Sequence, residues 1–247
     1  MTRAVLITGA AGGIGTALAA SFASGGDEVI LLDKDEAAVK SAAQTLRDNG
    51  SQVRSYVCDI TDDRSLGHLR AQMRSEGVRP SVLINNAGIE LRAETGSSGF
   101  LESWRKVMSV NLDAAAFLTQ LFIDDLAEVR GSVVNIASIQ SYAVLHTANT
   151  AYAVSKAAIA QLTRAMAVEY APRGVRVNAV APGVVETPMI RLAGQDPSRF
   201  SRFLDRIPMA RFAQPGEIAG PVRFLTSNEA SYVTGAVLPV DGGFLAM

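Results

Sequence analysis

Residues 4–24 place a short apolar run, a glycine-rich turn and a helical segment directly one after another. Ala4–Thr8 is apolar and predicts a buried strand. The turn Gly9–Gly15 contains four glycines, and small and apolar residues at helical spacing follow it in Thr16–Ser24. A strand that enters a helix through such a turn opens a βαβ unit, so this segment constrains the chain to an α/β fold.

The same alternation continues to the end of the chain. Further strands are predicted at Glu28–Leu32, Gln52–Cys58, Ser81–Asn85, Ser132–Ile136, Arg176–Ala181 and Ala236–Val240. Helices are predicted at Asp35–Asn49, Thr61–Glu76, Trp104–Val129 and Ala151–Ala171, then from Asp196 and from Pro215, with a loop at Ile89–Gly99. The pattern predicts one doubly wound α/β domain over residues 1–247, a Rossmann fold whose single parallel sheet has helices on both faces.

The charge and the cysteine content limit which partners and which cellular compartment can be expected. The net charge is −1, with acidic and basic residues interspersed, which argues against nucleic acid or a membrane surface as a partner. Cys58 is the single cysteine, so no intrachain disulfide can form. The apolar run Ala4–Ile7 is too short for the core of a signal peptide, and no apolar run approaches the length of a membrane span. We expect a cytoplasmic protein.

The glycine-rich turn and Asp33 together indicate a dinucleotide. Bare backbone N–H groups at the start of a helix can hold a pyrophosphate. Asp33 ends the second strand 18 positions after Gly15, where a carboxylate can accept hydrogen bonds from the adenosine ribose. It would repel a 2′-phosphate, and the turn offers no basic residue, although Lys34 follows Asp33. The pattern favours NAD over NADP, and an ordinary helix-capping aspartate is the alternative.

Tyr152 and Lys156 are four positions apart, so a helix places them on one face. An ammonium beside a phenol favours the phenolate and lowers the pKa of the phenol. A phenol tuned in this way can act as a general acid/base. The alternative is a tyrosine that simply packs on a lysine stem.

In this context the chain resembles a classical short-chain dehydrogenase/reductase from end to end. The residues that carry the resemblance are Thr8–Gly15 (TGxxxGIG), Asn85–Gly88 (NNAG), Asn111, Ser138, Tyr152 with Lys156 (YxxxK), and Pro182-Gly183. The resemblance implies an oxidoreductase that transfers a hydride between a nicotinamide cofactor and a secondary alcohol or ketone. It also implies a homotetramer built through the long helices and the last strand.

The resemblance also implies roles for individual residues. Tyr152 would be the general acid/base, Ser138 would bind the oxygen of the substrate, and Lys156 would hold the nicotinamide ribose. Asn111 would support a water that relays protons. The residues expected to bind the cofactor are Gly9, Gly12, Gly13, Ile14, Asp33, Asp59, Ile60, Asn86, Ala87, Gly88, Tyr152, Lys156, Pro182, Gly183, Val185 and Thr187. The residues expected to bind the substrate are Ser138, Gln140, Asn149 and Tyr152.

The substrate itself is less well defined. Ser138 and Tyr152 are 14 positions apart, one more than the commonest spacing in the family, which indicates an extra residue in the loop Ile139–Thr150. This loop, Val184–Arg211 and the loop Glu90–Ser98 are expected to shape the pocket. Polar residues of the loop Ile139–Thr150 favour a polyol or sugar. The segment Arg191–Arg211 resembles a lid over the substrate, and its five arginines are interpreted as a solvated helix face. His68 and His146 are expected in solvent, and no spacing predicts a metal site.

Two other functions remain open. One is a 3-oxoacyl-[acyl-carrier-protein] reductase, which usually uses NADPH and a basic cofactor turn. The other is a non-catalytic NAD-binding regulator, which should lack the tyrosine or the lysine of the pair.

Overall fold

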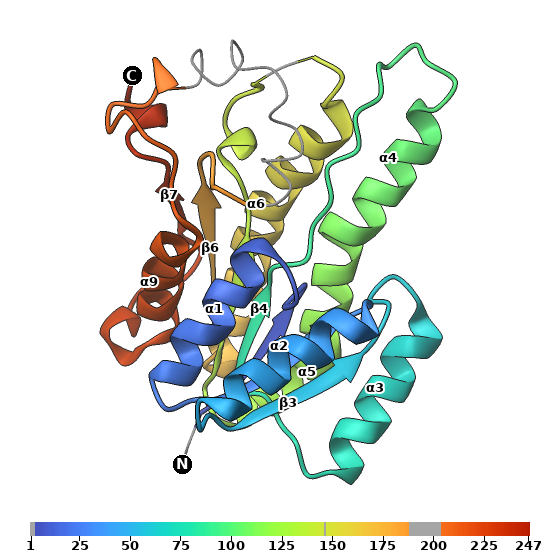
Figure 1. The fold of residues 1–247 in the computed structure, drawn as a ribbon, viewed down its shortest axis with the longest axis vertical. Coiled ribbons are helices and arrows are strands. Elements are labelled where there is room, and N and C mark those ends of the chain that lie inside the picture. Colours follow the sequence, from blue (N-terminus) through green and yellow to red (C-terminus); the bar gives the residue numbers. More distant parts are fainter. Residues whose placement is uncertain (1–2, 146, 188–203) are drawn as a thin grey trace.

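The computed structural model describes residues 3–145, 147–187 and 204–247. Within these ranges seven strands form one parallel sheet in the order β3-β2-β1-β4-β5-β6-β7 (Figure 1). The strands are β1 (Ala4–Thr8), β2 (Glu28–Asp33), β3 (Val53–Val57), β4 (Val82–Asn85), β5 (Ser132–Ile136), β6 (Arg176–Pro182) and β7 (Val237–Val240). The doubly wound parallel sheet predicted from the sequence is confirmed.

Helices connect the strands on both faces of the sheet. They are α1 (Gly13–Ser24), α2 (Glu36–Asp48), α3 (Asp63–Ser75), α4 (Phe100–Met108), α5 (Ala114–Glu128), α6 (Thr150–Tyr170) and α9 (Pro215–Thr226). Asp35 caps α2 by accepting a hydrogen bond from the backbone N–H of Ala38 at 3.0 Å. The helix start expected at Asp196 lies outside the described residues.

Alternate side chains of β1 enter different core layers. Val5 and Ile7 pack with Phe22 of α1 and Ile218 of α9, whereas Leu6 packs with Phe122 of α5 on the other face. All of these side chains are fully buried. A continuous apolar run therefore forms the strand, because both faces of a parallel sheet are covered.

The strand order reverses at β1, because β2 and β3 lie on one side of it and β4 lies on the other. Ligands of open α/β sheets bind at the carboxyl ends of the strands beside such a reversal. The fold therefore directs attention to the segments that follow β1 and β4.

The long helix predicted at Trp104–Val129 differs from the observed one in two respects. It begins earlier, at Phe100, and a π-helical segment, Ser109–Asp113, separates α4 from α5. Single π-helical turns inside α-helices often occur at functional sites. This one contains Asn111.

The same stretch corrects the expectation that nothing in the chain approaches a membrane span. Among the described residues, Phe100–Glu128 is long and apolar enough to cross a membrane by length and composition alone. Of its most apolar window, 44% is buried, and the core helix of a globular protein passes the same test. Leu118, Phe122 and Leu126 supply part of that apolar character and are fully buried in the core described above.

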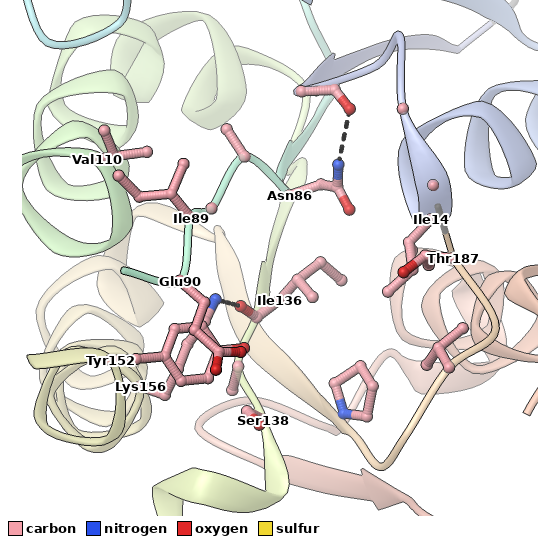
Figure 2. Close-up of a pocket in the computed structure, with 18 of the residues that line it drawn as sticks. Ile14, Asn86, Ile89, Glu90, Val110, Ile136, Ser138, Tyr152, Lys156 and Thr187 are labelled. Carbon is pink, nitrogen blue, oxygen red and sulfur yellow. Dashed lines mark hydrogen bonds between the residues drawn. The ribbon is translucent and has the colours of Figure 1, made fainter. Parts of the chain in front are cut away.

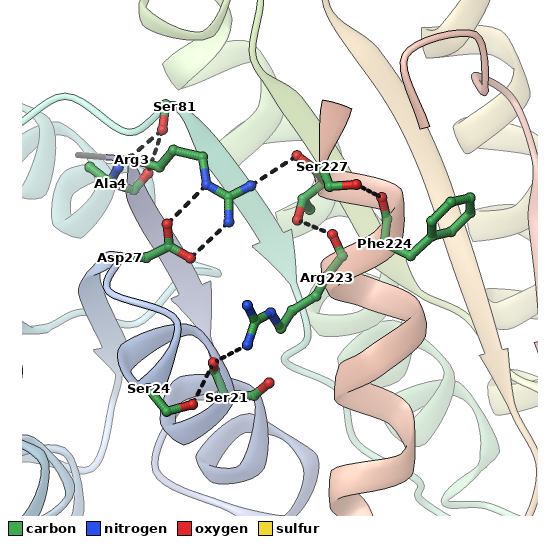
Figure 3. A network of polar contacts seen from close by, with 10 residues as sticks. Arg3, Ala4, Ser21, Ser24, Asp27, Ser81, Arg223, Phe224 and Ser227 are labelled. Carbon is green, nitrogen blue, oxygen red and sulfur yellow. Dashed lines mark hydrogen bonds and ion pairs between the residues drawn. The ribbon is translucent and has the colours of Figure 1, made fainter. Parts of the chain in front are cut away.

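A polar network joins α1 and α9 at the amino-terminal end of the sheet (Figure 3). Arg3 donates two hydrogen bonds to the buried carboxylate of Asp27, at 2.9 and 2.8 Å, and a third to the carbonyl of Thr226 at 3.1 Å. Arg223 donates to the carbonyl of Ser21 at 2.8 Å. These contacts hold together segments from the two ends of the chain.

Candidate active site

A cavity of roughly 610 Å³ opens at the carboxyl ends of the strands, beside the strand reversal (Figure 2). Its lining residues come from the glycine-rich turn and from the segments that follow β2 to β6. All but two of the predicted site residues line this cavity. The exceptions are Asn111 and Asn149.

The glycine-rich turn has the backbone that its sequence predicts. Gly9 has a φ of +61°, and a Cβ atom on it would lie 2.8 Å from the Cα of Ala87. A Cβ on Gly12 would meet no protein atom within 4 Å, and Gly12 lines the cavity. Gly12 also precedes α1, whose first N–H groups have no partner within the helix. This open cradle at a helix start fits the pyrophosphate of a dinucleotide.

Asp33 lies at the end of β2 and lines the cavity. Its carboxylate accepts hydrogen bonds from the backbone N–H groups of Ala11 and Asp35, both at 3.1 Å. The first bond fixes the carboxylate beside the glycine-rich turn, and the cap of the following helix is Asp35 rather than Asp33. A carboxylate has further lone pairs that can accept hydrogen bonds from ribose hydroxyls.

The segment after β4 is bonded to the turn after β1. Asn86 donates from its side chain to the carbonyls of Thr8 and Gly9, at 2.9 and 3.0 Å. In return the hydroxyl of Thr8 accepts hydrogen bonds from the backbone N–H groups of Asn86 and Ala87, both at 3.0 Å. The two segments therefore form one rigid edge of the cavity.

Tyr152, Lys156 and Ser138 lie together on the side of the cavity opposite the glycine-rich turn (Figure 2). Lys156 is buried, and its Nζ donates to the carbonyl of Ile136 at 2.7 Å. The same Nζ lies 5.7 Å from the centre of the Tyr152 ring. Gly88 lies beside the ammonium, and a Cβ atom there would lie 3.4 Å from Nζ, an ordinary van der Waals contact.

Burial is the main cause of the pKa shifts of Tyr152 and Lys156. It raises the pKa of Tyr152 to about 12, the Glu90 carboxylate adds to that shift, and the Ser138 hydroxyl opposes it. Burial also lowers the pKa of Lys156 to about 8. The sequence-based expectation that Lys156 lowers the pKa of Tyr152 is therefore corrected: spacing along a helix shows proximity, whereas burial decides the direction of the shift.

Asn111 is a buried residue that joins three segments behind the cavity. Its Oδ1 accepts a hydrogen bond from the N–H of Ile89 at 2.8 Å. Its Nδ2 donates to the carbonyl of Ile89 and to the hydroxyl of Ser155, both at 3.0 Å. The side chain thus fixes the segment after β4 against α6, one turn away from Tyr152.

Gln140 and Asn149 were both expected to bind the substrate, but only Gln140 lines the cavity. Gln140 lines the cavity, whereas Asn149 is buried behind it and donates from its Nδ2 to Gln140 Oε1 at 3.1 Å. Asn149 is therefore placed to orient Gln140 rather than to touch a ligand.

Glu90 and Arg92 line the cavity, from the loop Glu90–Ser98 that the sequence predicted to shape the pocket. Reasoning from the sequence missed other residues of the cavity wall, Lys106 of α4 and Ser109 and Val110 of the π-helical segment. His68 is exposed on α3, and His146 lies outside the described residues. No cluster that could hold a metal occurs among the residues described.

Comparison with known proteins covers nearly the whole chain. A family model described as enoyl-(acyl carrier protein) reductase matches residues 9–245. Galactitol 2-dehydrogenase (L-tagatose-forming) of Cereibacter sphaeroides is 41% identical, over 96% of this chain and 93% of that protein.

Two solved structures illustrate the range of cofactors and substrates among the relatives. A gluconate 5-dehydrogenase from Burkholderia cenocepacia J2315, in complex with NADP and tartrate, is 30% identical, with a TM-score of 0.92 over 99% of this chain and 96% of that one. A 3-oxoacyl-[acyl-carrier protein] reductase from Brucella melitensis, with bound NAD, is 33% identical, with a TM-score of 0.88 over 98% of this chain and 90% of that one.

Proposed function

The chain belongs to the short-chain dehydrogenase/reductase family, and from this premise we propose that it interconverts a secondary alcohol and a ketone of a polyol or sugar. The observation that carries the proposal is the presence of Tyr152, Lys156 and Ser138 in one cavity with the glycine-rich turn. The turn, Asp33 and Lys156 would hold a nicotinamide cofactor, which supplies or accepts the hydride.

Tyr152 would exchange the proton of the substrate's oxygen. In the reducing direction its neutral phenol donates this proton, and the raised pKa keeps the phenol protonated at neutral pH. In the oxidising direction the phenolate accepts it, so oxidation is favoured at alkaline pH. The Ser138 hydroxyl would hold the same oxygen, and Lys156 would bind the nicotinamide ribose while it stays bonded to Ile136.

The expected substrate is a polyol or sugar. This is supported by relatives named galactitol 2-dehydrogenase and gluconate 5-dehydrogenase, and by the polar Gln140 beside Ser138 in the cavity wall. A nicotinamide cofactor is common to the relatives, which bind NADP in one structure and NAD in another. We propose NAD for this chain, because the Asp33 carboxylate would repel a 2′-phosphate.

The remaining features of the proposal concern the whole protein. It would act as a single domain in the cytoplasm, as a homotetramer, without nucleic acid or a membrane as a partner. Its partner in the reaction would be a small-molecule substrate.

The test is NADH formation at alkaline pH with a panel of polyols, sugars and cyclic alcohols, with NAD and NADP compared. We expect a hit among the polyols or sugars, and a higher kcat/KM with NAD. The variant Tyr152→Phe should lower kcat by about 10²–10⁴-fold, because it removes the general acid/base, and should bind NADH as the wild type does. Retained turnover in this variant would refute the role of Tyr152, and a preference for NADP would refute that of Asp33.

A 3-oxoacyl reductase is the second candidate, supported by the Brucella melitensis relative. Reduction of an acetoacetyl thioester separates the two functions. A kcat/KM for the thioester above that for every polyol would favour this second candidate. Tight NADH binding without turnover of any substrate would instead favour a regulator.

A further inference from the structure

Glu90 brings a carboxylate to the catalytic side of the cavity. It lies two residues beyond Gly88, lines the cavity, and has a side chain that is 19% exposed. Figure 2 shows it beside Tyr152 and Lys156. Tyr152 and Lys156 line the same cavity as Glu90.

Glu90 is held in place by its own loop. Oε1 accepts a hydrogen bond from Nε of Arg92 at 3.0 Å, and Arg92 is the more exposed of the two, at 40%. A carboxylate offers about four lone-pair sites, so it can accept several hydrogen bonds at once. Arg92 thus orients the carboxylate from the solvent side.

The other charged groups of the cavity wall lie in two places. Asp33, Lys34 and Asp59 follow β2 and β3, at the end expected to hold the adenosine. Near Tyr152 the wall carries three cationic residues: Lys156, whose Nζ is bonded to Ile136, Lys106 of α4, and Arg92, which is bonded to Glu90. Glu90 is the acidic residue that lines the cavity on this side, within the part of the chain described.

We propose that Glu90 selects the substrate, by accepting a hydrogen bond from a hydroxyl on the carbon next to the reacting one. The inference rests on the proposed function and narrows it. A vicinal hydroxyl is a good donor to a carboxylate, and hydrogen bonds to charged acceptors are the stronger ones. A substrate that carries a carboxylate close to the reacting carbon would instead be repelled. Glu90 therefore favours uncharged polyols over sugar acids.

The test compares the wild type with Glu90→Gln, which keeps the shape and removes the charge. Glu94→Gln is the matched control, since Glu94 is an exposed residue of the same loop that does not line the cavity. The substrates are a hexitol, the aldonate of the same chain length, and cyclohexanol, which has no neighbouring hydroxyl. Each is assayed for kcat/KM with saturating NAD.

We expect Glu90→Gln to lower the hexitol-to-cyclohexanol ratio of kcat/KM by at least about ten-fold and to raise the aldonate-to-hexitol ratio. Glu94→Gln should leave both ratios within about two-fold of the wild type. Equal losses on hexitol and cyclohexanol in Glu90→Gln would overturn the inference, because they would mean that Glu90 acts on Tyr152 alone. An aldonate-to-hexitol ratio that does not rise in Glu90→Gln would overturn it as well.

The two proposals fail in different ways. If the wild type oxidises none of the alcohols, the proposed function is refuted. Calorimetric binding of the hexitol to the protein–NAD complex then tests Glu90 by itself. Weaker hexitol binding to Glu90→Gln, with NAD binding intact, would support the inference. Equal hexitol binding by both proteins, or no binding by the wild type, would overturn it.

Discussion

At the scale of single residues, one cause acts on Tyr152 and Lys156 in opposite senses. Burial disfavours a charged group, so it raises the pKa of the phenol and lowers that of the ammonium. The phenol therefore keeps its proton at neutral pH, whereas the lysine is close to losing one. Alcohol oxidation needs the Tyr152 phenolate as the proton acceptor. Because the pKa of the phenol is raised, we expect the rate of oxidation to rise with pH.

The shift of Lys156 predicts a pH dependence of stability. Its pKa is about 8 in the folded chain and about 10.4 when unfolded, so between these values the unfolded chain binds more protons. The free energy of unfolding attributable to Lys156 therefore rises with pH, by about 1 kcal/mol from about pH 8 to pH 9. Lys156→Met should lack this gain. Urea unfolding of both proteins at the two pH values measures it.

The raised pKa of Cys58 acts in the opposite sense but is common to both proteins, so it cancels in the comparison. The control is Lys40→Met, because Lys40 is 66% exposed and should keep the pH dependence of the wild type. Parallel pH profiles for the wild type and Lys156→Met would contradict the prediction.

At the scale of elements, the sequence predicted the strands better than the helices. Most strands are short apolar runs between turn residues, a pattern that depends on local sequence alone, and β3 (VRSYV) is the weakly patterned one. The π-helical segment contains Asn111, whose side chain bonds to Ile89 and Ser155, 22 and 44 positions away. No local pattern contains those contacts, so the break in the helix could not be predicted.

The residues of the site also divide into those predicted from local sequence and those placed by tertiary packing. Gly9 and Asp33 have roles that follow from the backbone of the turn and the end of a strand, so motif and spacing were sufficient to select them. Lys106 of α4 and Ser109 of the π-helical segment line the same cavity because both elements pack beside α6. That packing is tertiary, and the spacing of these residues along the chain carries no trace of it.

The network between α1 and α9 predicts a stability effect at the level of elements. Arg3→Ala would leave the carboxylate of Asp27, which is 7% exposed, without its guanidinium partner. We expect a loss of about 2–3 kcal/mol in the free energy of unfolding, because a buried charge would lose its hydrogen-bond donors. Urea denaturation measures it.

The comparison for Arg3→Ala is an exposed ion pair. Lys40→Ala removes a partner of Glu36 at a site where both side chains are about two-thirds exposed. Such pairs contribute less than about 1 kcal/mol. An equal loss in the two variants would mean that the network does not stabilise the junction of α1 and α9.

At the scale of the whole molecule, α6 presents an apolar stripe to the outside. Val154 and Val168 are 39% and 78% exposed, and exposed Ala157 and Ala165 lie between them on the same helical face, with Gln161 as a polar residue in the middle of the stripe. Ala160 and Ala167, in contrast, are buried within the chain. The alanines of α6 thus divide into those that pack internally and those left on the surface.

The exposed stripe supports the proposed homotetramer and leads to a prediction about mass. Light scattering of the wild type should give about four times the 26.0 kDa mass of the chain. Val168→Asp should give a smaller assembly, because a buried unpaired carboxylate at an interface opposes association. Val57→Asp is the matched control, since Val57 is 49% exposed on the edge strand β3, away from α6, and should leave the mass unchanged. A monomeric wild type would refute the tetramer, and an unchanged mass in Val168→Asp would move the interface to another face.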